Sequence, residues 1–165
     1  MRRLLATGGA LTLAFFQATV LANGVSNGVY PDLVMVWVVA LSLVYGAREA
    51  TWWAFWSGIV LDILSAGPFG VFTLSLLLIA LMASLGESNI YQASLLLPLF
   101  TGLVASFVYY LLLFFFLTTL GGKVAWWSSW PAIGLASLMN TALMPLAHKL
   151  AERISSRRAL LDASR

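Results

Sequence analysis

The sequence predicts an all-α, polytopic integral membrane protein, built as a bundle of six transmembrane helices. Hydrophobic residues make up 61% of the 165-residue chain and charged residues 9%, and the mean hydropathy is +0.94. Soluble domains are far more polar than this. The apolar residues also fall into six long segments, and most charges lie between these segments or at the ends of the chain. Composition and pattern therefore agree on the class.

Each apolar segment is expected to form one membrane-crossing helix, which needs about 20 residues. The expected helices cover residues 4–22, 31–46, 50–66, 69–86, 93–120 and 130–150. Short turn-like stretches separate them at residues 23–28, 47–49, 67–68, 87–89 and 121–123. Residues 1–150 are thus expected to form one compact domain, followed by a basic cytoplasmic tail over residues 151–165.

Basic residues set the expected orientation. With a cytoplasmic N-terminus, every Lys and Arg except Lys123 lies on the inside, as the positive-inside rule requires. Both termini are then cytoplasmic. The net charge of +3 consequently reflects topology and contact with anionic lipid, and it gives no support to nucleic-acid binding.

The first segment allows a second interpretation. Arg2 and Arg3, an apolar run and the small residue Ala22 resemble a signal peptide with its cleavage site. The apolar run is longer than usual for a signal peptide and leads directly into further spanning segments, which favours retention.

Small residues recur along the same segment. Alanines stand at strict four-residue spacing, which places them on one helix face and lets another helix approach closely. They are Ala6, Ala10, Ala14, Ala18 and Ala22. We interpret this alanine stripe as a docking face for a partner helix. The partner helix can belong to another protein or to a second copy of this chain in a homodimer. Ordinary packing inside the bundle is the alternative.

Asp62 is the most unusual residue, because it lies within an apolar segment one helical turn after Gly58. A carboxylate at the centre of a spanning helix costs about 2.5–3.5 kcal/mol on insertion scales. We therefore expect Asp62 to face protein or water near the outer surface, with Asn tolerated there and Lys not.

Asp32 follows Pro31, and this pair is typical of a helix start. A second interpretation gives Asp32 a binding role. If the second and third expected helices are neighbours, Asp32 and Asp62 line one outward-facing pocket, and either carboxylate can meet Lys123. Three further polar side chains in the spans are expected to form interhelical hydrogen bonds: Gln17, Asn140 and Thr141.

The sequence gives little support to catalysis. There is one histidine, His148, and there is no cysteine. No carboxylate or imidazole set has metal-ligand spacing, and no nucleophile elbow or phosphate loop is present. We expect a protein that is not an enzyme and has no catalytic, metal-binding or cofactor-binding residues.

The central part of the chain resembles the rod shape-determining protein MreD family. The resemblance rests on the Tyr30-Pro31-Asp32-Leu33 start of the second helix and on the run from Phe55 through Asp62 to Gly70. Length and helix count fit as well. The matching motif positions are Pro31, Asp32, Gly58, Asp62, Gly67 and Gly70.

This resemblance implies a scaffold of the cell-elongation machinery in the bacterial cytoplasmic membrane. It implies association with the bitopic protein MreC and, through it, with RodA and a penicillin-binding transpeptidase that build peptidoglycan. In fold, the family also resembles the substrate-binding subunits of energy-coupling-factor transporters. A vitamin-binding subunit of such a transporter is the alternative function.

Overall fold

A computed structural model describes residues 2–21, 30–65, 67–85, 96–120 and 126–163. The described residues form six α-helices, one π-helical segment and no strand. In chain order these are α1 (Arg2–Phe16), η1 (Gln17–Leu21), α3 (Leu33–Tyr45), α4 (Ala47–Leu64), α5 (Val71–Ser84), α6 (Leu96–Thr119) and α7 (Trp126–Ala163). The expected all-α class is confirmed for this part of the chain.

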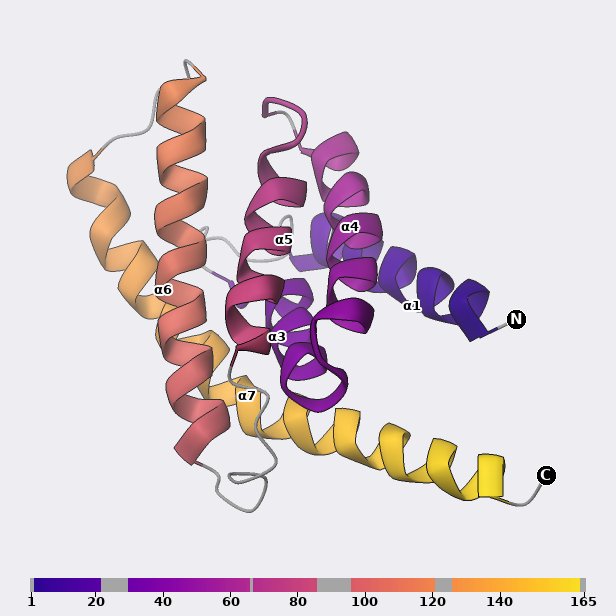
Figure 1. Ribbon diagram of the computed structural model, residues 1–165. Coiled ribbons are helices and arrows are strands. Elements are labelled where there is room, and N and C mark those ends of the chain that lie inside the picture. Colours follow the sequence, from indigo (N-terminus) through magenta and orange to yellow (C-terminus); the bar gives the residue numbers. More distant parts are fainter. Residues whose placement is uncertain (1, 22–29, 66, 86–95, 121–125, 164–165) are drawn as a thin grey trace.

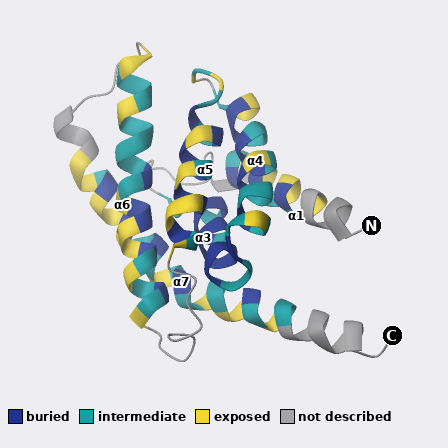
Figure 2. Cartoon of the chain, viewed as in Figure 1, coloured by how far each residue is buried: buried dark blue, intermediate teal, exposed yellow. Residues whose placement is uncertain are grey.

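Helix α3 forms the centre of the bundle. It contacts α1, α4, α5, α6 and α7, and Figure 1 shows the other helices arranged around it. Nearly all of its side chains are apolar, and most are buried. A helix that is hydrophobic all round is expected inside a bundle. Figure 2 accordingly shows α3 largely dark blue, while exposed residues face outward on α6 and α7.

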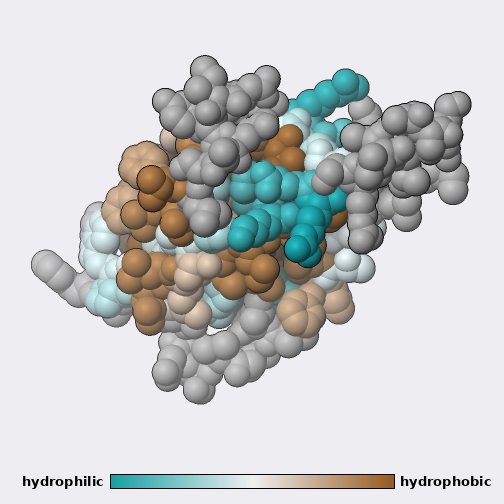
Figure 3. All heavy atoms as spheres, turned by 90° about the horizontal axis from the view of Figure 1, so that it is seen from below, coloured by the Kyte–Doolittle hydropathy of each residue, from teal (hydrophilic) through white to brown (hydrophobic). Residues whose placement is uncertain are grey.

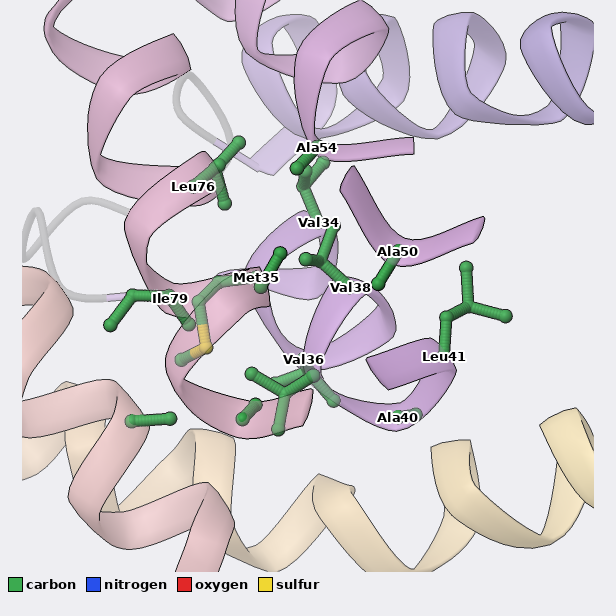
Figure 4. Packing of buried hydrophobic residues seen from close by; sticks show 14 of the residues in the cluster. Val34, Met35, Val36, Val38, Ala40, Leu41, Ala50, Ala54, Leu76 and Ile79 are labelled. Atoms are coloured by element: carbon green, nitrogen blue, oxygen red, sulfur yellow. The ribbon is translucent and has the colours of Figure 1, made fainter. Parts of the chain in front are cut away.

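The core is built on both sides of α3. Val34 and Val38 of α3 pack toward the alanines Ala50 and Ala54 of α4, as Figure 4 shows. Met35 points toward the α5 side, where Ile79 is buried. Small alanines on α4 allow close approach of the α3 backbone, because they leave room for the branched valines.

The connection between α3 and α4 is a single residue, Gly46. Its φ of 75° is in the left-handed region, which glycine adopts without steric penalty. The Gly46 amide donates to the Ser42 carbonyl at 3.1 Å and closes α3. Arg48 and Glu49, which we expected in the turn, therefore belong to the first turn of α4. An acidic residue is favoured there by the helix dipole.

Of the helices described, α6 alone is long and apolar enough to cross a membrane by the joint test of length and hydropathy. Helices α3 and α5 are apolar but shorter. At a rise of about 1.5 Å per residue, α3 is about 20 Å long. The sequence pattern gave it 16 residues, whereas the structure ends it at the left-handed Gly46 and begins it after Asp32.

Helix α7 does not end near residue 150, where the sequence pattern placed the end of the last span. It continues to Ala163 and contains both Pro131 and Pro145. His148 therefore lies inside a helix and not at a helix end. Its Nε2 lies 3.3 Å from Oε1 of Glu152, one turn further along.

Candidate functional site

The Asp62 carboxylate lies on α4 but binds the start of α5. Oδ1 accepts from the backbone N–H of Phe72 at 2.9 Å, and Oδ2 accepts from that of Thr73 at 3.1 Å. The Thr73 hydroxyl donates to the same Oδ2 through a short hydrogen bond. The Asp62 side chain is buried, so it faces protein and not lipid.

Helix α5 needs this carboxylate because its own N-cap residue has no side chain. The N-cap is Gly70, which adopts a left-handed φ of 97°. The first amides of a helix have no partner within the helix, and in a membrane no water reaches them. Asp62 supplies the acceptor that a Ser or Asp would normally supply at the N-cap. Its negative charge also suits the positive end of the helix dipole.

Gly58 permits the short distance between the two helices. A Cβ atom at this position would lie 2.5 Å from Cα of Thr73, a separation that real structures do not tolerate. Gly58 and Asp62 lie one turn apart on the same face of α4. The glycine brings the α5 backbone close, and the carboxylate then binds the amides of that same turn.

The start of α3 has a second set of polar contacts. Asp32 is the N-cap, and its Oδ1 accepts from the Met35 N–H at 2.9 Å. The Val34 N–H donates to Oε1 of Gln17 in η1 at 2.8 Å, and the Asp32 N–H donates to Oδ1 of Asn140 in α7 at 2.7 Å. Three side chains from three parts of the chain thus satisfy amides of one helix start.

Asn140 also joins a third helix. Its amide Nδ2 donates to the Tyr110 hydroxyl on α6 at 3.3 Å, so one side chain links α3, α6 and α7. The hydroxyl of the neighbouring Tyr109 is buried and close to the Asp32 carboxylate. Both tyrosines are part of the site, although the sequence alone gave no signal that distinguishes them from other aromatic residues. The Thr141 hydroxyl instead donates to the Ser137 carbonyl of its own helix at 2.7 Å, so the interhelical hydrogen bond expected for it was wrong.

Tyr30 lies at the edge of this site, just outside the spanning segment. Burial raises the pKa of its phenol, and the nearby charge of Asp32 raises it further. The phenol therefore stays protonated at neutral pH and remains a hydrogen-bond donor.

Asp32 and Asp62 do not share a hydrogen-bond partner among the described residues. Each is bound to a different helix start, α3 in one case and α5 in the other. The contacts described here thus give no support to a common pocket. Lys123, the third member of that hypothesis, lies outside the described residues.

The alanine stripe of α1 packs within the bundle over its described part. Ala10 and Ala14 are buried, and α1 makes its main contacts with α4. A Cβ at Gly9 would come within 2.8 Å of the Trp53 ring on α4. Ala18 also packs against the core, and the side chains of Ala6 and Ala22 are outside the described residues. These contacts favour the alternative interpretation, packing inside the chain, over a partner face.

The remaining motif residues lie in turns. Pro31 immediately precedes the N-cap Asp32 and lies two positions before Leu33, the first helical residue of α3. Gly67 is exposed beside the Leu117 side chain of α6. Among the described residues, no group of three or more His, Asp or Glu side chains is placed to hold a metal ion.

The chain matches the family of the rod shape-determining protein MreD over residues 5–160. This match covers nearly the whole chain, including both capped helix starts. The chain belongs to the MreD family. No curated protein and no solved structure matches the chain.

As a member of the MreD family, the chain is a bacterial membrane protein with a role in determining rod shape. The family consists of shape-determining structural proteins. Four of the motif residues that resemble the MreD family position helices in this structure. Gly58, Asp62 and Gly70 together join α4 to α5, and Asp32 begins α3.

Proposed function

We propose that this protein is a non-enzymatic scaffold of the cell-elongation machinery, which regulates peptidoglycan synthesis by holding partner membrane proteins. One observation carries the proposal. The buried acidic side chains described, Asp32 and Asp62, are both engaged in helix starts. Their hydrogen bonds hold helices of the bundle in place, which is a structural role.

The outer surface of the bundle fits such a role. Exposed side chains on α5, α6 and α7 are mostly large and apolar, as lipid-facing and helix-facing surfaces are. Association of helices in lipid depends on close van der Waals packing and a few hydrogen bonds. A rigid bundle can therefore hold the single spanning helix of an MreC-like protein, and through it RodA and a penicillin-binding transpeptidase.

The proposal includes a multi-pass topology with six crossings and both termini in the cytoplasm. Short helices such as α3 then cross as the centre of the bundle, where other helices and not lipid surround them. The buried polar contacts at the starts of α3 and α5 support this placement, because helix ends inside a membrane need partners from the protein.

The test is affinity purification of a tagged full-length copy from its native host in mild detergent, followed by mass spectrometry. We expect recovery of an MreC-like protein together with RodA or the transpeptidase. A tagged multi-pass protein of unrelated function, expressed at the same level, is the control for nonspecific co-extraction. Recovery of a transporter coupling subunit with its ATPases, without elongation proteins, would contradict the scaffold and favour a vitamin-binding subunit.

A further inference from the structure

Helix α7 is much longer than a membrane crossing requires. Its 38 residues span about 57 Å at 1.5 Å per residue, whereas the hydrocarbon core of a bilayer is about 30 Å thick. In Figure 1, α7 bends in its middle, and its C-terminal half runs away from the bundle at a steep angle to α6. Pro145 lies in this part of the helix, and proline is the usual cause of such a bend.

The C-terminal half leaves the bundle shortly after Ala151. Ala151 is fully buried and belongs to the core, while Lys149, Leu150 and Arg153 are exposed. Figure 3 views the molecule from below and shows hydrophilic side chains gathered next to apolar ones on this side. Because α6 is the helix that fits the bilayer thickness, a segment steeply inclined to α6 runs closer to the membrane plane.

The sequence of this segment has the pattern of an interfacial helix. At 100° per residue, Leu150, Ile154 and Leu161 fall on one narrow stripe. Basic positions border the stripe on both sides, with Arg153 and Arg157 on one side and Arg158 on the other. Long basic side chains beside an apolar stripe are typical of helices that lie at the headgroup level, with the apolar face in the acyl region.

We propose that residues 149–163 lie flat on the cytoplasmic leaflet and bind the phosphate headgroups of anionic lipids. The occupant of the apolar stripe is the lipid surface itself, because the flanking positive charges complement acidic headgroups. The proposal is independent of which protein the bundle holds. It assigns the tail a second membrane contact that fixes how α7 leaves the bilayer.

The absence of cysteine from the chain makes a direct test simple. Full-length Leu161→Cys and Asp162→Cys are spin-labelled and reconstituted in phosphatidylcholine vesicles with and without phosphatidylglycerol. The positions are adjacent but about 100° apart on the helix. With phosphatidylglycerol, the label at Leu161→Cys should be accessible to oxygen and shielded from a water-soluble relaxation agent, and the label at Asp162→Cys should show the reverse.

Charge supplies the second arm. The label at Leu161→Cys should shift toward water when arginines of the tail are replaced by Arg153→Gln, Arg157→Gln and Arg158→Gln. The ratio of membrane-bound to free tail should fall about fivefold for each arginine removed. High salt should act in the same direction. If both labels remain aqueous in phosphatidylglycerol vesicles, the proposal is wrong. If they are aqueous there but shielded in native membranes, the tail binds a protein and the lipid assignment also fails.

Discussion

At the residue scale, Asp62 shows how a carboxylate becomes tolerable inside an apolar segment. Its two oxygens accept three hydrogen bonds from Phe72 and Thr73, and the donors are groups that would themselves be costly to bury unpaired. Asp62 therefore satisfies unpaired amides at the start of α5, although it belongs to α4. The four-residue interval to Gly58 is explained by the same contact.

Replacing Asp62 tests this role. Asp62→Ala leaves buried donors without an acceptor, at about 1–3 kcal/mol each. Asp62→Asn keeps one carbonyl oxygen and should lose less, whereas Asp62→Lys places a cation at the positive end of α5 and should lose most. Melting temperatures of the purified variants in detergent should therefore be highest for Asp62→Asn, lower for Asp62→Ala and lowest for Asp62→Lys. Glu49→Gln on the same helix is the control, and its free energy of unfolding should change by less than about 1 kcal/mol.

Cell shape of a native host that carries Asp62→Asn tests whether Asp62 has only this structural role. If Asp62→Asn melts near the wild-type temperature and is present at normal levels but fails to support rod shape, then the ionised carboxylate has a function beyond helix capping.

At the scale of elements, the α4–α5 pair is held by shape as much as by polar contacts. Gly58 has no room for a methyl group, whereas Gly134 on α7 has no atom within 4 Å of the position a Cβ would take. Two glycines that look alike in the sequence therefore have different reasons to be there. The difference gives a matched pair of substitutions.

Gly58→Ala should force α4 and α5 apart, with a loss of about 1–3 kcal/mol in unfolding free energy. Gly134→Ala should be neutral or stabilising by up to about 1 kcal/mol, since alanine has the higher helix propensity. Thermal unfolding in detergent, followed by circular dichroism, distinguishes the two. Equal destabilisation by both would show that the close approach at Thr73 does not limit stability.

At the scale of the whole molecule, the polar contacts join segments that are far apart in the chain. Asn140 binds the amide of Asp32, 108 residues earlier, and Gln17 of η1 binds the same helix start. The central helix α3 is therefore fixed at its N-terminal end by the first and last parts of the chain. The start of α3 is thus held by its own N-cap Asp32 and by side chains of η1 and α7.

The proposed topology has a direct measurement. A fluorescent protein fused after residue 165 should fluoresce, because it folds only in the cytoplasm, and alkaline phosphatase inserted at the Gly67-Pro68 turn should be active outside. The same phosphatase inserted beside Gly46 should be inactive. Phosphatase activity in a fusion at the C-terminus would overturn the orientation that the basic residues predict.

The sequence by itself determined the class of the protein, the approximate helices and the family, because these follow from apolar run length and from the local order of a few motif residues. It also indicated that Asp32 begins a helix, since capping is a local interaction. The tertiary structure decided what Asp62 binds, which helix fills the described part of the alanine stripe and which residues complete the start of α3. Those outcomes depend on contacts between residues far apart in the chain, and no local pattern specifies the partner in such a contact.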